Sequence, residues 1–328
     1  MLVLMVVGLI ACASAESSVV EPVTTFDSGL PEGLAVDRHG DLYVGLVGGE
    51  IKKVTPDGQV SSFATSLDPG EGFLVGLAFD QQGVLYAALS SSNPETHGIW
   101  EIKADGTAQR FVALDPQGLP NAIAVDQSGN VLVSDSFLGK IWKVTPGREV
   151  SVWAEDDLLL GLKEDSPTDL AFGANGMAFG QDSMLYVVNT DFGRLVRIPV
   201  NPNGEADSTE LILEDKGLEG ADGIALDDKD NVYVAVSRQD KLVRIFPDEE
   251  IEILATEGLD FPASLAFGKG EESKSLYITN FAFLRAQGLV EGDPNPSLVV
   301  GRGSSGKATA LALESTGRGY NLQLEEKK

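Results

Sequence analysis

The sequence predicts an all-β fold, a six-bladed β-propeller with four-stranded blades, and three observations support this prediction. A short strand pattern occurs six times, and consecutive copies begin 41 to 54 residues apart, which is the length of a propeller blade. Each copy is followed by a tight turn and by further strand-like runs. The chain of 328 residues contains 37 glycines and few long runs of helical periodicity.

The repeated pattern is an apolar inner strand whose fourth residue is always alanine: Ala35, Ala78, Ala124, Ala178, Ala225 and Ala266. A small side chain at this position suits strands that crowd around a common axis. We therefore expect the inner strands at residues 32–37, 75–80, 121–126, 175–180, 222–227 and 263–268.

The remaining strands follow in the same order within each repeat. Second strands are expected at 42–44, 85–87, 131–133, 185–187, 232–234 and 276–278, and third strands at 51–54, 99–102, 141–144, 195–198, 242–245 and 297–300. Outer strands are expected at 60–64, 109–113, 150–154, 210–213 and 252–255. The sixth repeat lacks a fourth strand, which the run at residues 20–26 can supply. Such pairing of the chain ends would close the ring and leave no long unpaired edge.

Residues 1–15 have the character of a signal peptide, because an apolar run ends at the small residues Ala13, Ser14 and Ala15. The run is too short to span a bilayer. Cys12, the single cysteine, follows Leu-Ile-Ala as in the lipobox of bacterial lipoproteins, so lipidation of Cys12 and its removal with the signal peptide are alternatives. We expect an extracytoplasmic or secreted propeller at residues 16–301, or one lipid-anchored at the membrane surface, with no transmembrane span. Residues 302–328 break the repeat and are expected to form a loosely ordered tail.

The charge of the chain limits its partners. It carries 50 acidic and 24 basic side chains, for a formal net charge of −26. This negative potential repels phosphate backbones and anionic lipid surfaces, which argues against a nucleic-acid partner. Metal ions, cationic ligands and neutral small molecules stay open as partners.

The first position of the inner strands suggests a functional site. Its six residues are Glu32, Val75, Asn121, Asn175, Asp222 and Ala263. Equivalent positions of different blades surround the central channel, so two carboxylates and two amide oxygens should face the same volume. Oxygen ligands of this kind suit a hard divalent cation. The alternative is that these side chains only bond channel water and neighbouring backbone. Without a cation, the two carboxylates would repel each other and one would tend to protonate.

The motifs that open these strands resemble the SMP-30/gluconolactonase/luciferin-regenerating-enzyme family of six-bladed propellers over about residues 20–300. They are the residues 30–33, 119–121, 174–176 and 221–223. The resemblance implies one divalent ion, calcium or zinc with calcium favoured, held by Glu32, Asn175 and Asp222. It also implies that Asn121 approaches the substrate and that Asp222 acts as general base.

Leu119 departs from the family pattern, since sugar-lactone members carry an arginine at this place. A less polar lactone or ester therefore stays open as substrate. Residues 53–58, which read Lys-Val-Thr-Pro-Asp-Gly, are also shared with NHL-type and streptogramin-lyase propellers.

Three further polar side chains have an expected place relative to the site. Asp135 ends a second strand on the side of the predicted site, and it is either a substrate or second-ion contact or a cap of the strand end. His39 is expected in a solvated turn on the opposite face, and His97 in an exposed loop on the site face. The longest loops, at residues 90–97, 155–174 and 282–296, all fall on the site face, where they can cap a ligand.

These observations favour an exported, divalent-metal-dependent hydrolase that acts on lactones or related esters, with a metal ion at the channel mouth that activates water. The alternative is a non-catalytic NHL-like propeller that binds a ligand or partner and holds a structural metal ion. A streptogramin-type lyase is disfavoured, because no histidine occurs at the first position of the inner strands.

Overall fold

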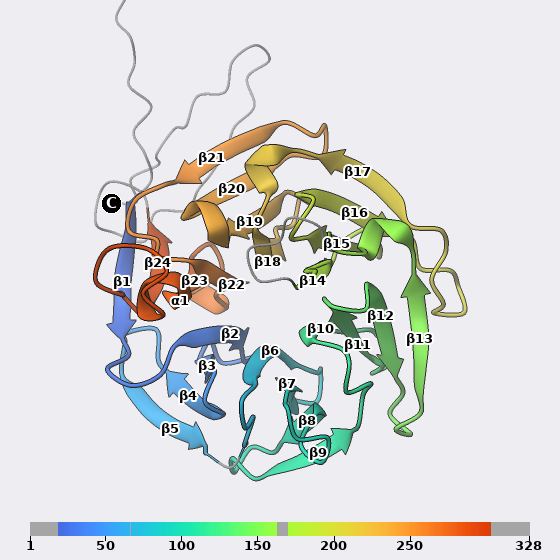
Figure 1. Cartoon of the computed structure of the whole chain (residues 1–328), viewed down its shortest axis with the longest axis horizontal. Coiled ribbons are helices and arrows are strands. Elements are labelled where there is room, and N and C mark those ends of the chain that lie inside the picture. The colour runs from blue at the N-terminus through green and yellow to red at the C-terminus, as the bar shows by residue number, and fades with distance from the viewer. Residues whose placement is uncertain (1–18, 66, 163–169, 303–328) are drawn as a thin grey trace, which may run out of the picture.

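Six four-stranded antiparallel sheets surround a central axis in the computed structural model, which describes residues 19–65, 67–162 and 170–302 (Figure 1). The sheets follow one another around the ring in chain order, and each runs from an inner strand at the axis to an outer strand at the rim. The predicted six-bladed propeller is confirmed.

Each of the first three complete blades contributes four consecutive strands. Blade one contains β2 (Pro31–Val36), β3 (Leu42–Leu46), β4 (Glu50–Val54) and β5 (Val60–Ala64). Blade two contains β6 (Phe73–Phe79), β7 (Leu85–Ser90), β8 (Gly98–Ile102) and β9 (Ala108–Val112). Blade three contains β10 (Pro120–Val125), β11 (Val131–Asp135), β12 (Lys140–Val144) and β13 (Val150–Glu155).

The other blades repeat this order. Blade four contains β14 (Ala174–Phe179), β15 (Leu185–Asn189), β16 (Arg194–Ile198) and β17 (Glu210–Glu214). Blade five contains β18 (Ala221–Leu226), β19 (Val232–Val236), β20 (Lys241–Ile245) and β21 (Ile251–Ala255). Blade six contains β22 (Pro262–Phe267), β23 (Leu276–Asn280) and β24 (Ser297–Arg302), with the N-terminal β1 (Val19–Thr25) as its outer strand. The helical pieces are 3₁₀ turns at Asp157–Leu159, Lys216–Leu218, Ser237–Gln239 and Gly270–Glu272 and the short α1 (Phe283–Ala286).

The ring closes where the two ends of the described chain meet. β1 pairs antiparallel with β24, with Val20 opposite Gly301 and Thr25 opposite Ser297. The predicted closing strand is therefore confirmed. The predicted signal peptide, Cys12 and nearly all of the predicted tail lie outside the described residues.

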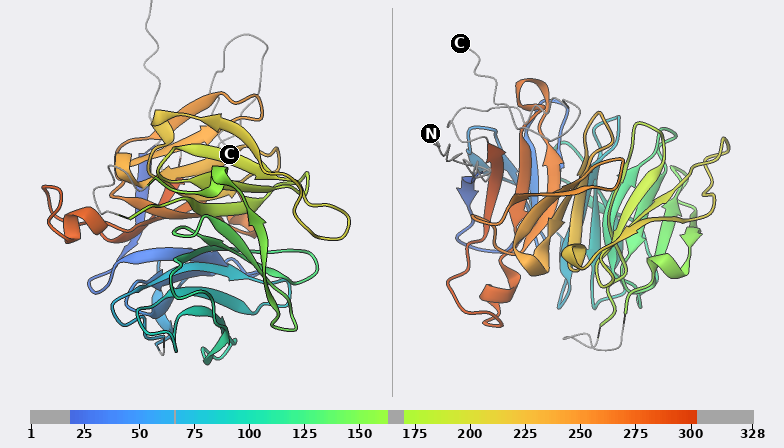
Figure 2. Two further views of the ribbon diagram at one scale, coloured as in Figure 1. Left: turned by 45° about the vertical axis from the view of Figure 1, so that its right-hand side comes forward. Right: turned by 90° about the horizontal axis from the view of Figure 1, so that it is seen from above.

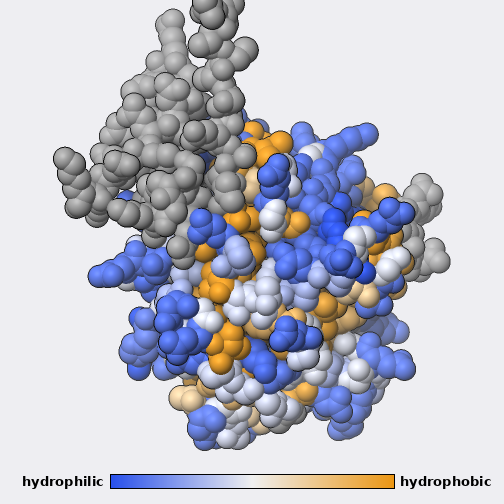
Figure 3. Space-filling view, turned by 90° about the vertical axis from the view of Figure 1, so that its left-hand side faces the viewer, coloured by the Kyte–Doolittle hydropathy of each residue, from blue (hydrophilic) through white to orange (hydrophobic). Residues whose placement is uncertain are grey.

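The interior of the ring consists of apolar layers between neighbouring blades. Six clusters of buried side chains fill the six blade-to-blade interfaces. The second strands are the most enclosed as a group, since in five of the six blades every residue of this strand is buried: β3, β11, β15, β19 and β23. Hydrophilic side chains cover much of the outer flank, with hydrophobic patches between them (Figure 3). No helix in the described ranges has the length and apolar character needed to cross a bilayer.

The turns on one face of the ring are short, and aspartate side chains stabilise them by accepting backbone hydrogen bonds. The turn between β10 and β11 is typical, because the Asp126 carboxylate accepts hydrogen bonds from the backbone N–H groups of Ser128 and Asn130 at 2.8 Å each. Asp80 and Asp227 make the corresponding bonds in blades two and five. Longer loops join second to third strands and one blade to the next, so antiparallel order places them together on the other face. α1 lies on that face (Figure 2).

Every inner strand carries a bulge at the position predicted to face the axis. The register shifts between Pro31 and Leu34 in blade one, and at the same place in the other five blades. Four of the six strands have glycine in the bulge. A Cβ atom at Gly33, Gly76, Gly176 or Gly223 would lie 2.1 to 2.4 Å from a carbonyl oxygen of the next blade. Glycine is therefore required where the inner backbones approach one another.

Gly176→Ala tests this crowding, since its Cβ would lie 2.2 Å from the Asp222 carbonyl oxygen. We expect a loss of about 1–3 kcal/mol in the free energy of unfolding, because backbone rather than a flexible side chain must move. Urea unfolding measures it. The control is Gly48→Ala, which has no atom within 4 Å of the added Cβ. Equal stability of the two variants would contradict the role given to Gly176.

Candidate metal centre

A small cavity lies on the axis at the start of the inner strands. Its volume is about 80 Å³, and β2, β6, β10, β14, β18 and β22 all contribute to its lining. All four predicted oxygen-bearing side chains line it: Glu32, Asn121, Asn175 and Asp222. Residues separated by up to 190 positions in the sequence thus share one volume because their blades are equivalent.

The amide of Asn121 is oriented by a hydroxyl from the neighbouring strand. Asn121 Nδ2 donates to Ser136 Oγ at 3.1 Å, and Ser136 Oγ donates its own proton to the carbonyl oxygen of Ala174 at 2.7 Å. Because the hydroxyl has a single proton, it can only accept from Asn121. The amide must therefore present its nitrogen to Ser136, which leaves Oδ1 free of this contact.

Asn175 is held by the same device one blade further on. Asn175 Nδ2 donates to Thr190 Oγ1 at 3.0 Å, and Thr190 Oγ1 donates to the carbonyl oxygen of Ala221 at 2.7 Å. Thr279 Oγ1, from within β23, donates to the carbonyl oxygen of Glu32 itself at 2.7 Å and so joins blade six to blade one. These hydroxyls join adjacent blades at the cavity and fix the backbone from which the site residues project.

The Glu32 carboxyl is buried without a full set of partners. Glu32 is 6% exposed, and its Oε2 atom has no hydrogen-bond partner. Burial raises the pKa of Glu32 well above its ordinary value, and the nearby Asp222 carboxylate raises it further. A buried carboxylate oxygen with no donor is costly, so this atom marks a place for a cation or a proton.

Asp222 is the second carboxylate of the cavity. Burial raises its pKa to about 7, although a hydrogen bond from Asn175 and the positive charge of Arg238 act in the opposite direction. Arg238 does not neutralise Asp222 directly, because its Nη2 donates to Asp191 Oδ1 at 2.9 Å. A cation bound between these two carboxyl groups would stabilise their charged forms and lower both pKa values.

These residues fit a divalent cation by their chemistry. Two carboxylates and two oriented amides supply only oxygen ligands, as calcium prefers. In the described part of the chain, no group of three His, Cys, Asp or Glu side chains is arranged to hold a metal ion. The amide of Asn175 must therefore complete the predicted set of Glu32, Asn175 and Asp222, and water would supply further ligands.

Asp135 does not line this cavity. Its carboxylate is fully buried and accepts from the backbone N–H of Leu119 at 2.8 Å and of Leu138 at 3.1 Å, and from Trp142 Nε1 at 2.9 Å. These contacts are those of a strand-end cap, which is one of the two interpretations that the sequence left open.

The two histidines differ from each other. His39 is exposed in the turn after β2, as predicted. The prediction of an exposed His97 is wrong, since this residue is 1% exposed. Its loop folds back on blade two: His97 Nδ1 accepts from the Ser91 N–H at 3.1 Å, and the guanidinium of Arg110 donates to the His97 carbonyl oxygen. Burial lowers the pKa of His97.

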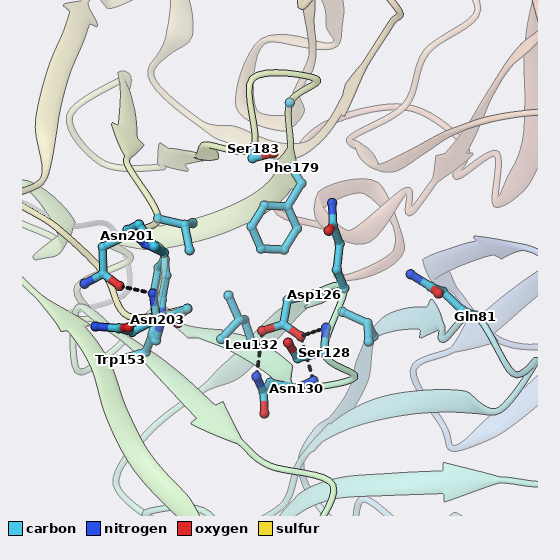
Figure 4. A pocket seen from close by; sticks show the side chains of 16 residues that line it. Gln81, Asp126, Ser128, Asn130, Leu132, Trp153, Phe179, Ser183, Asn201 and Asn203 are labelled. Carbon is cyan, nitrogen blue, oxygen red and sulfur yellow. Dashed lines mark hydrogen bonds between the residues drawn. The ribbon is translucent and has the colours of Figure 1, made fainter.

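A larger groove of about 410 Å³ opens on the opposite face between blades three and four (Figure 4). Asp126 is the carboxylate in it, and its oxygens are occupied by Ser128 and Asn130 of its own turn. The groove therefore offers less reactive chemistry than the smaller cavity on the axis.

The fold and the axial oxygen ligands define a six-bladed propeller with a candidate cation site. Residues 162–282 match the family described as SMP-30/Gluconolactonase/LRE-like region, so the resemblance expected from the sequence is confirmed over this stretch. Residues 25–54 match the description strictosidine synthase-like, N-terminal. No curated protein is significantly similar to the chain.

Solved structures share the fold at low sequence identity. A gluconolactonase from Xanthomonas campestris is 17% identical, with 86% of this chain and 88% of that chain covered and a TM-score of 0.63. The calcium-binding protein regucalcin from Agrobacterium tumefaciens is 16% identical, with 86% and 93% covered and a TM-score of 0.63. Virginiamycin B lyase from Staphylococcus aureus is 15% identical, with 80% and 81% covered and a TM-score of 0.57.

Sequence reasoning missed the hydroxyls of Ser136, Thr190 and Thr279. A signal for them exists, because all three lie at or beside the end of a second strand, at Asp135, Asn189 and Asn280 respectively. Their role depends on a backbone carbonyl of the next blade, which sequence spacing does not reveal.

The raised pKa of Asp222 predicts how stability depends on pH when no cation is bound. The folded protein holds a proton on Asp222 between about pH 4 and 7 that the unfolded chain releases, so the contribution of Asp222 to stability is greatest below about pH 4 and is lost as pH rises to about 7. In EDTA, the free energy of unfolding of the wild type should decrease between pH 5 and 8. We expect this decrease to be smaller in Asp222→Asn by on the order of 2 kcal/mol. Urea unfolding at both pH values measures this difference.

The control for this experiment is Asp228→Asn, which removes the same charge from an exposed position. It should leave the pH dependence of the wild type unchanged. An identical pH dependence in Asp222→Asn and wild type would contradict the electrostatic account of the cavity.

Proposed function

We propose that the protein is a divalent-cation-dependent hydrolase of lactones or related esters. The observation that carries the proposal is the meeting of two carboxyl groups with raised pKa values and two oriented amides in one axial cavity. Their position on the loop-rich face supports it, because loops on a rigid scaffold commonly form ligand sites. The shared fold with a gluconolactonase is consistent with this chemistry.

Glu32, Asn175 and Asp222 would hold the cation. When bound, a divalent cation polarises an ester carbonyl and lowers the pKa of a nearby water molecule. Calcium is favoured over zinc because the site offers oxygen ligands, and the similarity to a calcium-binding regucalcin agrees with this choice.

Side chains of the cavity would transfer the proton and orient the substrate. Asp222 accepts a proton from the attacking water molecule while the water oxygen forms a bond to the carbonyl carbon. When the ester bond breaks, Asp222 returns this proton to the leaving alkoxide oxygen. Asn121, fixed by Ser136, orients the substrate beside it. Ser136 and Thr190 are positioning residues, since they act through the amides of Asn121 and Asn175.

We also propose that the protein acts outside the cytoplasm. The apolar run and small-residue site within residues 1–15 support export, and Cys12 would give a lipid anchor if it is retained. The high negative charge suits a small neutral substrate better than a nucleic acid.

Metal analysis of the purified protein is the first test. We expect close to one equivalent of calcium, or of zinc, together with hydrolysis of at least one member of a lactone and ester panel that EDTA abolishes and the added metal restores. Metal that raises the melting temperature without any turnover would instead indicate a non-catalytic propeller with a structural ion. Turnover that persists in the metal-free protein would overturn the proposal.

Isosteric variants test the roles of the two carboxylates. Glu32→Gln and Asp222→Asn should each weaken metal binding, and Asp222→Asn should retain at most about one hundredth of the hydrolytic rate even at saturating metal, because it cannot accept a proton. The matched control is Glu257→Gln at an exposed position, with unchanged metal affinity and rate. Full activity of metal-saturated Asp222→Asn would assign the base elsewhere.

A further inference from the structure

The cavity on the axis is too small for a whole organic substrate. Its volume of about 80 Å³ compares with roughly 300–1,000 Å³ for the pockets that enclose small-molecule ligands. It has room for an ion, a reacting group and little else. Most of a substrate bound there must therefore lie outside the cavity, against the residues that surround its mouth.

The positions at which the chain enters the inner strands, just outside the cavity, lack polar side chains. Two residues before the axial position of each inner strand, toward the site face, the chain has only leucine, phenylalanine or glycine: Leu30, Phe73, Leu119, Gly173, Gly220 and Phe261. No side chain of this ring can donate hydrogen bonds to the hydroxyl groups of a sugar-like substrate.

An aromatic cluster extends from this ring over one side of the mouth. It consists of Phe73, Phe261, Phe281 and Phe283, all half-buried. Ring centroids lie 5.2 Å apart for Phe281 and Phe283, 5.9 Å for Phe261 and Phe281, and 6.2 Å for Phe73 and Phe283. Phe73 belongs to blade two and Phe283 to α1 of blade six, so this contact crosses blade one, the blade that carries Glu32.

The backbone beneath the cluster is strained. Phe261 and Ala282 have positive φ angles of 48° and 55°, which side-chain-bearing residues rarely adopt. The two segments are tied together, since the Phe281 N–H donates to the Phe261 carbonyl oxygen at 3.1 Å and the Ala282 N–H to the Asp260 carbonyl oxygen at 2.9 Å. Strain of this kind is typical of ligand sites.

The two arginines nearest the cluster are already paired with carboxylates. Arg285 of α1 bonds the carboxylate of Asp260 and, at 3.1 Å, that of Asp240. Arg238 is paired with Asp191. Neither arginine is therefore available to neutralise an anionic substrate, whereas the loop beyond α1 adds the exposed side chains of Leu289 and Val290.

We propose that the site selects neutral esters or lactones with an apolar substituent, aromatic or alkyl, that packs on Phe73, Phe261, Phe281 and Phe283 while the carbonyl group enters the cavity. This inference rests on the proposed hydrolytic function. Burial of the substituent against the rings supplies binding energy that a sugar lactone could not obtain there.

The test compares three δ-lactones: glucono-δ-lactone, δ-valerolactone and its hexyl-substituted form, δ-undecalactone. We expect kcat/KM for δ-undecalactone to exceed that for δ-valerolactone by at least about tenfold, because several methylene groups become buried. Glucono-δ-lactone should be the poorest substrate. Phe73→Ala and Phe283→Ala should each remove most of the advantage of the hexyl chain, so that the ratio of kcat/KM for δ-undecalactone to that for δ-valerolactone falls toward one.

The matched control is Phe246→Ala, a half-buried phenylalanine on the opposite face, which should change neither value. Melting temperatures and circular dichroism verify that all variants are folded. Preference for glucono-δ-lactone, or a hexyl advantage that survives both substitutions at the cluster, would overturn the inference.

A second measurement separates this inference from the proposed function. Calorimetry with the lactam analogue of δ-undecalactone reports binding without turnover. If no lactone is hydrolysed but the lactam binds wild type at least about tenfold more tightly than Phe283→Ala, the hydrolase proposal fails and the apolar ligand class stands. If the lactam does not bind, or binds both equally, the inference fails even where lactones are hydrolysed.

Discussion

The close approach of six inner backbones at the axis is the constraint on which the rest of the structure depends. At Gly176 the carbonyl oxygen of the next blade occupies the space that a Cβ would need, and the bulge at the same point interrupts the regular strand register. The bulge turns a side chain toward the axis beside the glycine. The features that allow the ring to pack thus also place Glu32, Asn121, Asn175 and Asp222 around one cavity.

The placement of two carboxyl groups in one cavity is electrostatically unfavourable. Glu32 is buried and Asp222 is partly buried beside it, and both carboxyl groups have raised pKa values as a consequence. The backbone that carries them is held by hydroxyl bonds between blades, so the carboxyl groups cannot simply move apart. A proton or a cation must compensate for their proximity, so any cation that the site binds would also stabilise the fold.

The periodic features of the molecule could be predicted from the sequence. Recurrence of alanine in the inner strands predicts the blades, and the residue three places earlier predicts the four oxygen-bearing side chains that line the axial cavity. What could not be predicted depends on the paths of single loops. His97 is buried because its loop folds back onto Arg110, and Phe73 meets Phe283 because α1 reaches across a blade. Neither contact has a counterpart in the other repeats, so the repeat pattern of the sequence does not predict it.

The pairing of β1 with β24 has a consequence for the biogenesis of the protein. The strand made first finds its partner only when the strand near the end of the described chain has been made. Until then, β1 has no partner strand and the ring cannot close. A ribosome-bound chain can therefore form individual blades but cannot complete the toroid until β24 has been made.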